Sequence, residues 1–191
     1  AQHTDAVAIA PYFHGCWTRP VPPRVSNCSN TTTIPMTLDE ARSLDDVFAV
    51  IDGVYNTTPG IPDADRGDSN NLDATIKSLV AQKAQLDMIT SHEIELYAYE
   101  GGLHLTFAGD ASSYEVAVRD GLYDFMASAN TDSRMKERYT RLLNGWKEAG
   151  GKLFALFTAP QTPSKHGSFG IKEHINSTRD TSPKYDGAMT F

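Results

Sequence analysis

Apolar residues along this chain occur in two patterns, and the first is a short continuous run. Three such runs are 5-DAVAIA-10, 94-IELYAY-99 and 153-LFALFT-158. Runs of this length that are apolar on both sides are typical of β-strands buried on both faces of a sheet. We therefore predict a parallel sheet of three strands with both faces covered by other elements.

Between these runs, apolar residues recur at the three- and four-residue spacing of amphipathic helices. The predicted helices cover, in chain order, residues 37–54, 72–89, 113–128, 133–149 and a short closing segment near 183–191. The first opens on the capping-box pattern 37-TLDE-40. Gly150 and Gly151 end the fourth, as glycines at helix C-termini do. The order strand, helices, strand, helices, strand, short helix predicts a single α/β domain over residues 1–191.

The face of the second predicted helix is marked by six apolar residues. They are Leu72, Ile76, Leu79, Val80, Leu86 and Ile89. In the fourth predicted helix, the apolar stripe consists of Met135, Tyr139, Leu142, Leu143 and Trp146. We expect both faces to pack against the sheet or against each other.

The charge and hydropathy of the chain indicate which classes of binding partner it is suited to. The formal net charge is −7 and the 17 basic residues are dispersed. This distribution argues against nucleic acid, which needs clustered Lys and Arg, and against anionic lipid. The sequence has no apolar run near the eighteen or so residues that a membrane span needs, and no pattern of a signal peptide. Neutral or weakly polar ligands fit this chain better.

The two cysteines, Cys16 and Cys28, lie in a long loop rich in Pro, Ser and Thr. We favour a disulfide in an exported protein, with two free thiols as the alternative. A metal site is not expected, because no histidine or cysteine lies at zinc-finger spacing around them. Four N-x-S/T sequons begin at Asn27, Asn30, Asn56 and Asn176. Together these features favour an extracellular or periplasmic location.

Polar and aromatic side chains follow each predicted strand. In parallel α/β folds the carboxyl ends of strands meet at one edge, where functional sites collect. The side chains at or soon after the three strand ends are Tyr12, His14, Trp17, Glu100, His104, Thr158, Gln161, His166 and Phe169. Their convergence predicts a site at this edge of the sheet.

Glu100 ends the second strand, and two glycines follow it directly. Glycosidases use a pair of carboxyl groups together with aromatic rings that stack on sugar faces. Gly101 and Gly102 would let the backbone turn sharply and leave room for a substrate. The alternative is that Glu100 is a rim carboxylate paired with an arginine, and that the aromatic residues nearby only pack the loops.

Four stretches carry a resemblance to a known family. They are 7-VAIAPYF-13, 99-YEGGLHL-105, 134-RMKERYTRLLNGWKEAGGKLFALFT-158 and 165-KHGSFGIKEHINSTRDTSPKYDGAMTF-191. Together they resemble the carboxyl-terminal part of a family of (β/α)8-barrel proteins related to the clan-A glycoside hydrolases. The resemblance implies that the chain forms the last three strand-helix units of a TIM barrel.

The resemblance also implies roles for individual residues. Glu100 matches the nucleophile at the end of the penultimate barrel strand, and Tyr12 matches a tyrosine near that carboxylate. Phe169 stands where the family usually has tryptophan, and Leu103 stands where it commonly has a polar residue. Both differences remove a possible hydrogen-bond donor or acceptor from the site.

These observations predict a retaining glycoside hydrolase that acts on a polysaccharide or oligosaccharide without a cofactor or metal. Glu100 would be the nucleophile, Tyr12 and His104 would orient it, and the other substrate-binding residues would be His14, Trp17, His166 and Phe169. A non-catalytic carbohydrate-binding barrel and a structural subunit of a larger extracellular assembly are the alternatives. A complete barrel needs roughly 250 residues. We therefore expect an amino-terminal barrel portion or a complementing chain, which would supply the acid/base carboxylate.

Overall fold

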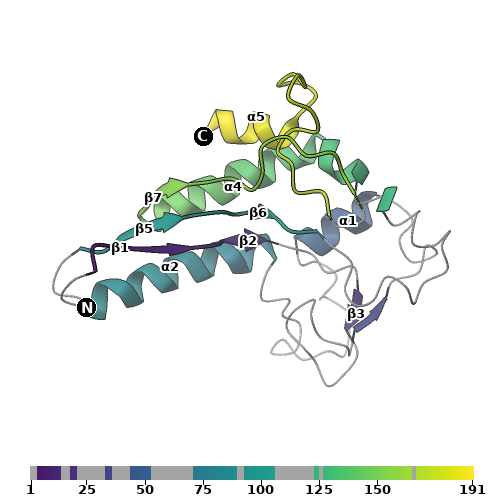
Figure 1. Cartoon of the computed structure of the whole chain (residues 1–191). Coiled ribbons are helices and arrows are strands. Elements are labelled where there is room, and N and C mark those ends of the chain that lie inside the picture. The colour runs from purple at the N-terminus through teal and green to yellow at the C-terminus, as the bar shows by residue number, and fades with distance from the viewer. Residues whose placement is uncertain are drawn as a thin grey trace.

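The computed structural model describes residues 4–13, 18–20, 33–35, 44–52, 71–89, 93–105, 123–124, 127–164 and 167–191. Strands β1 (Ala6–Ile9), β5 (Glu95–Ala98) and β7 (Gly151–Phe154) form a parallel sheet in the order β1-β5-β7. Figure 1 shows these strands side by side. Strand β2 (Tyr12–Phe13) pairs in parallel with β6 (Gly102–Leu103), and β3 (Thr18–Pro20) pairs antiparallel with β4 (Thr33–Pro35).

The pairing of β1 with β5 leads directly into the pairing of β2 with β6. Ala6 lies opposite Glu95 at the start of this ladder, and Tyr12 lies opposite Gly102 at its end. Between the two pairs, the N–H of Tyr99 donates to the carbonyl of Ile9 at 3.1 Å. The carboxyl ends of the first two predicted strands therefore lie side by side.

The third strand was predicted at residues 153–158, but its regular pairing begins earlier, at Gly151. Gly150 has a φ of +82° and reverses the chain directly after the helix, so Gly151 already belongs to the sheet. After β7, the N–H of Ala155 still donates to Ala98 and that of Phe157 donates to Gly101. This part of the chain thus continues beside β5 up to the loop that follows Glu100.

Helices α2 (Leu72–Ile89) and α4 (Arg134–Glu148) pack against the same face of β5. Leu96 and Ala98 of the strand share a buried cluster with Leu79 of α2 and Trp146 of α4. The predicted stripe of α4 is confirmed, since all five of its residues are buried. On α2 the predicted face is wrong in two places.

The two exceptions on α2 are Val80 and Ile89, which are 50% and 69% exposed. Thr75 is buried instead, and its hydroxyl donates to the carbonyl of Tyr12 at 3.0 Å. The helix therefore turns a narrower apolar face to the sheet than its periodicity predicts. At Val80 the reason is a tertiary contact, because the polar Thr75 finds its hydrogen-bond partner on β2 and that side of the helix is buried.

Helices α1 (Leu44–Ile51) and α5 (Pro183–Thr190) flank α4. Buried residues of α1, among them Phe48 and Ile51, pack with Tyr139 of α4 in a second core cluster. Gly187 allows α5 to approach closely, because a Cβ there would lie 2.4 Å from the carbonyl oxygen of Lys136. The predicted helix over 113–128 falls partly outside the described residues, and its described residues 123–124 and 127–128 are helical. The capping box at 37–40 lies outside them.

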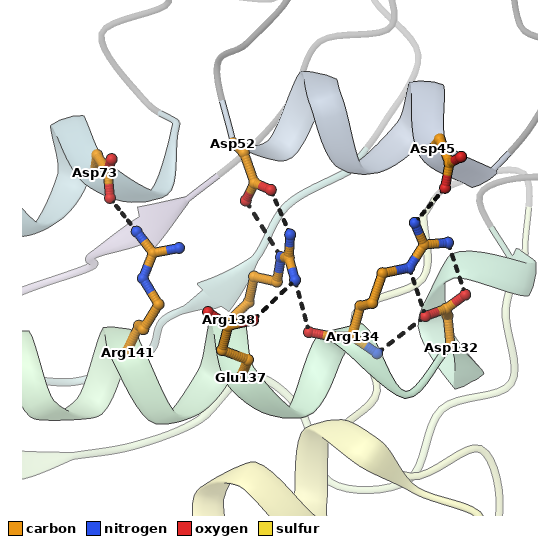
Figure 2. Close-up of polar contacts among 8 residues, drawn as sticks. All are labelled: Asp45, Asp52, Asp73, Asp132, Arg134, Glu137, Arg138 and Arg141. Carbon is orange, nitrogen blue, oxygen red and sulfur yellow. Dashed lines mark hydrogen bonds and ion pairs between the residues drawn. The ribbon is translucent and has the colours of Figure 1, made fainter.

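Three arginines on α4 connect it to α1 and α2, as Figure 2 shows. The pairs are Arg134 with Asp45, Arg138 with Asp52, and Arg141 with Asp73. The ring of Phe48 lies beneath two of the guanidinium groups, with centroid distances of 4.1 Å to Arg134 and 4.8 Å to Arg138. These contacts orient the helices around the core that carries the strand ends.

The prediction that both faces of the sheet are covered is not met within the part of the chain that the structure describes. Ala6 and Ala8 of β1 are exposed, and Leu153 of β7 is 63% exposed. The described strands form an open sheet and do not close into a barrel. Among the described helices, none has the length and apolar character that a bilayer crossing requires.

Candidate functional site

Four rings meet where the strands end. Tyr12 lies on β2, His104 follows β6, Phe157 follows β7, and Phe169 lies in the loop before α5. The Tyr12 ring contacts His104 at 5.4 Å and Phe157 at 6.2 Å between centroids. The Phe169 ring contacts His104 at 5.2 Å and Phe157 at 5.7 Å. We call this closed set of four rings the aromatic cluster.

Glu100 lies against this cluster through Tyr12. The pKa of Tyr12 is raised well above its ordinary value by burial of the phenol, and further by the charge of Glu100 and a hydrogen bond to its carboxylate. The Glu100 side chain is half-buried. Within the described residues, no arginine or lysine forms an ion pair with it, so the described contacts give no support to the alternative of a rim ion pair.

The two glycines after Glu100 are required by the backbone and by packing. Gly102 has a φ of +132°, a conformation that residues with a side chain rarely adopt. A Cβ on Gly101 would lie 2.7 Å from the ring of Phe154 and 2.9 Å from the carbonyl oxygen of Pro11. Gly101 therefore leaves room for the neighbouring strands, whereas the sequence suggested room for a substrate.

His104 contacts both Tyr12 and Phe169 through its ring. Its backbone N–H donates to the carbonyl of Phe13 at 2.8 Å, which fixes its position relative to β2. Burial lowers the pKa of the imidazole, because the charged form loses hydration. The neutral ring is therefore favoured at neutral pH, and it can donate from one nitrogen and accept at the other.

Helix α4 packs against the strand ends through Tyr139, and α2 bonds to β2 through Thr75. The hydroxyl of Tyr139 accepts the N–H of Leu103 at 3.1 Å, directly after the two glycines. Tyr139 is fully buried, and burial raises the pKa of its phenol. Its ring also meets that of Phe13 edge to face at 5.8 Å. The aromatic cluster is thus supported by a packed second layer of side chains.

The structure brings together four of the predicted site residues: Glu100, Tyr12, His104 and Phe169. Thr158 and Gln161 are described and half-buried; the carbonyl of Thr158 accepts the N–H of Ile171, and the N–H of Gln161 donates to the carbonyl of Lys172. The remaining predicted residues, His14, Trp17, His166, Cys16 and Cys28, lie outside the described residues. Sequence reasoning missed Phe157, which is 36% exposed within the cluster. Phe157 belongs to the apolar run 153–158, so the sequence assigned it to the interior of a strand. Only its position near the end of that run indicated that it could lie at the edge of the sheet where the strands end.

This arrangement offers a carboxylate, a phenol, a neutral imidazole and apolar ring surfaces at one edge of a sheet. Such a combination suits a polar ligand with apolar faces, of which a sugar is the common example. Within the described part of the chain, no group of three or more His, Cys, Asp or Glu residues is placed to hold a metal ion.

Comparison of the chain with profiles of protein families, with curated proteins and with solved structures gives no match. The likeness to clan-A barrel proteins therefore stays a prediction, and the support for a function comes from the geometry around Glu100.

Proposed function

We propose that this chain supplies the nucleophile and part of the sugar-binding surface of a secreted retaining glycoside hydrolase. The observation that supports the proposal most is the half-buried Glu100 carboxylate, hydrogen-bonded by Tyr12 beside four rings at the carboxyl ends of parallel strands. The substrate would be a polysaccharide or oligosaccharide.

A glycosidase nucleophile must be ionised and held in place when it attacks the anomeric carbon. The phenol of Tyr12 remains protonated, so it can donate to the carboxylate and hold it in place. Hydrogen bonds to a charged acceptor are among the stronger ones in proteins. Phe154 packs closely against Gly101, and Tyr139 packs closely against Gly102. These contacts restrict the backbone that carries Glu100.

The aromatic cluster would bind the sugar. Phe157 and Phe169 offer apolar ring surface, and the imidazole of His104 places a polar ring between Tyr12 and Phe169. The ring contacts of 5.2 Å to 6.2 Å keep these side chains in a fixed mutual arrangement. A rigid platform lowers the entropy lost when a sugar is ordered on it.

Glycoside hydrolysis also needs an acid/base carboxyl group, which in a retaining enzyme lies about 5–5.5 Å from the nucleophile. We propose that a further portion of the barrel, upstream or on a complementing chain, supplies this group and covers the open sheet. The exposed Ala6, Ala8 and Leu153 fit such a covering. No cofactor or metal enters the proposed reaction.

A non-catalytic carbohydrate-binding protein is the second candidate, because the aromatic cluster serves binding without any chemistry. A structural subunit of a larger extracellular assembly is the third, and the open sheet face fits it. The second and third candidates would have the same aromatic cluster and open sheet as the first. They differ from it because neither would hydrolyse a sugar.

Glu100→Gln tests the proposal. The natural assembly would be assayed for reducing-sugar release on a panel of soluble plant, fungal and bacterial polysaccharides. The amide keeps the shape and removes the negative charge, so we expect turnover to fall about 10³-fold or more while affinity for the polysaccharide persists. Unchanged hydrolysis in Glu100→Gln would contradict the assignment.

Glu95→Gln is the matched control, because Glu95 lies at the opposite end of β5 and accepts a hydrogen bond from Tyr97. Its substitution should leave turnover unchanged. If the unsubstituted protein binds a polysaccharide in affinity electrophoresis and hydrolyses none, the non-catalytic candidate stands. The mass of the native particle, compared with that of the denatured chain, reveals whether a complementing chain is present.

A further inference from the structure

Lys184 is a buried amine that the proposed chemistry does not use. It lies in the first turn of α5 and its side chain is 0% exposed. Its ammonium donates to the carbonyl oxygen of Ser168 at 2.6 Å and lies 5.8 Å from the centroid of the Tyr139 ring. Ser168 immediately precedes Phe169 of the aromatic cluster.

The backbone on the other side of Phe169 is also held. The side-chain amide of Asn130 donates to the carbonyl of Gly170 at 3.5 Å, and the N–H of Ile171 donates to Thr158 at 2.9 Å. Gly167 has a φ of +132°, and a Cβ there would lie 2.5 Å from the Phe169 ring. The ring is therefore placed by the backbone of its own loop.

From this geometry we infer that Lys184 is a positioning residue, which holds the Phe169 ring against His104 and Phe157 through its hydrogen bond to Ser168. Only the role of that ring as a sugar platform rests on the proposed function. The place of the ring in the fold does not depend on it.

The choice of lysine at this position has a cost that an apolar residue would avoid. Burying an amine disfavours its charged form, and a positive group at a helix N-terminus is opposed by the helix dipole. Burial lowers the pKa of Lys184 to about 7, partly offset by the negative charge of Glu173. The described groups that face the amine are this carboxylate and the Tyr139 ring. Of the contacts around the amine, the bond to Ser168 is the one that requires a donor.

The test places a fluorescent reporter at the ring. Phe169→Trp adds an indole, and subtracting the spectrum of the unsubstituted protein removes the signal of the two natural tryptophans. Acrylamide quenching of the added indole then measures how well it is packed, with no sugar present. Lys184→Met is introduced in this background, with Lys152→Met as the control because Lys152 lies on the surface of β7 with half of its side chain exposed.

We expect Lys184→Met to raise the quenching constant of the indole and Lys152→Met to leave it unchanged. Lys184→Gln keeps a hydrogen-bond donor without the charge, so it should restore part of the protection. Equal quenching in the parent, Lys184→Met and Lys184→Gln would overturn the inference. Because no hydrolysis is measured, this result is independent of whether Glu100 is a nucleophile.

A second measurement applies if Lys184→Met does not fold. In the Phe169→Trp protein alone, an ammonium donates more strongly than the neutral amine that replaces it as pH rises. We expect quenching of the indole to increase between about pH 6.5 and pH 9, across the lowered pKa of Lys184. His104 releases its proton below this window because its pKa is lowered. A flat profile across the window would refute the positioning role.

Discussion

The hydroxyl of Tyr139 accepts the backbone N–H of Leu103 at 3.1 Å, which joins α4 to β6 directly behind the Glu100 turn. Both groups are buried, so no water replaces the acceptor if it is removed. A Cβ on Gly102 would lie 3.0 Å from the same hydroxyl oxygen. The Tyr139 hydroxyl thus accepts the hydrogen bond of Leu103 and also leaves no room for a side chain at position 102.

Tyr139→Phe removes the acceptor and leaves the N–H of Leu103 unpaired. We expect the free energy of unfolding to fall by about 1–3 kcal/mol, as for other unsatisfied buried donors. Urea unfolding followed by circular dichroism measures the change. Tyr185→Phe is the control, since Tyr185 is only half-buried and its ring lies beneath Lys172. Equal stabilities of the two variants would contradict the role of the Tyr139 hydroxyl.

Arg138 and Arg141 of α4 should differ in their contributions to stability (Figure 2). The Arg138 side chain is 11% exposed, bonds Asp52 through two nitrogens and lies over Phe48. Arg141 is 39% exposed and pairs with Asp73, which is 58% exposed. We expect Arg138→Met to cost about 2 kcal/mol and Arg141→Met less than about 1 kcal/mol. Urea unfolding of both variants checks the order, and a larger loss in Arg141→Met would refute it.

Tyr12→Phe removes the hydroxyl that donates to Glu100 while the ring stays in the aromatic cluster. A hydrogen bond to a charged group contributes about 1.5–3 kcal/mol, which corresponds to a fall in turnover of roughly 10- to 150-fold. Because the ring remains, KM should change little. Steady-state kinetics of polysaccharide hydrolysis separate the two constants. A rise in KM with unchanged turnover would show that Tyr12 contacts the sugar and does not orient the carboxylate.

Lys184 should make stability depend on pH in the alkaline range. Below about pH 7 the amine is charged in both the folded and the unfolded chain, and the full cost of its burial is present. Above that pH the folded chain releases a proton that the unfolded chain keeps up to its ordinary pKa of 10.5, so stability rises with pH. The gain is about 1.4 kcal/mol for each pH unit within this window.

Lys184→Met lacks this gain. Urea unfolding of both proteins between about pH 7 and pH 9 checks the prediction, because every other titrating group is common to the two. The stability of the parent minus that of the variant should therefore rise with pH across this range. A constant difference would contradict a lowered pKa for Lys184.

Several elements could be predicted from sequence because their signals are local. The stripe of α4 repeats at helical spacing, and each of its residues is buried as the period requires. The apolar runs at 5–10 and 94–99 became neighbouring parallel strands. Helix α1 and the short closing helix α5 also lie where the pattern places them.

Other features depend on contacts between distant parts of the chain. Periodicity assigned Val80 to the packed face of α2, but the hydroxyl of Thr75 bonds to the carbonyl of Tyr12 and the helix buries that side instead. Phe157 reads as a strand residue until the hydrogen bond of its N–H to Gly101 places it at the rim. The burial of Lys184 and its bond to Ser168 had no signal in the neighbouring sequence, because they depend on the packing of α5.

Local sequence patterns were enough to place β1, β5 and the helices α1, α2, α4 and α5, and to show that Glu100 follows a strand with two glycines behind it. Hydrophobic spacing and glycine are properties of neighbouring residues, so they can be interpreted without a fold. Only the folded structure showed that Phe157 lies against Tyr12 and Phe169 and that the Lys184 amine donates to Ser168. Such contacts join residues far apart in the chain, and only the packing of the sheet and helices brings them within reach.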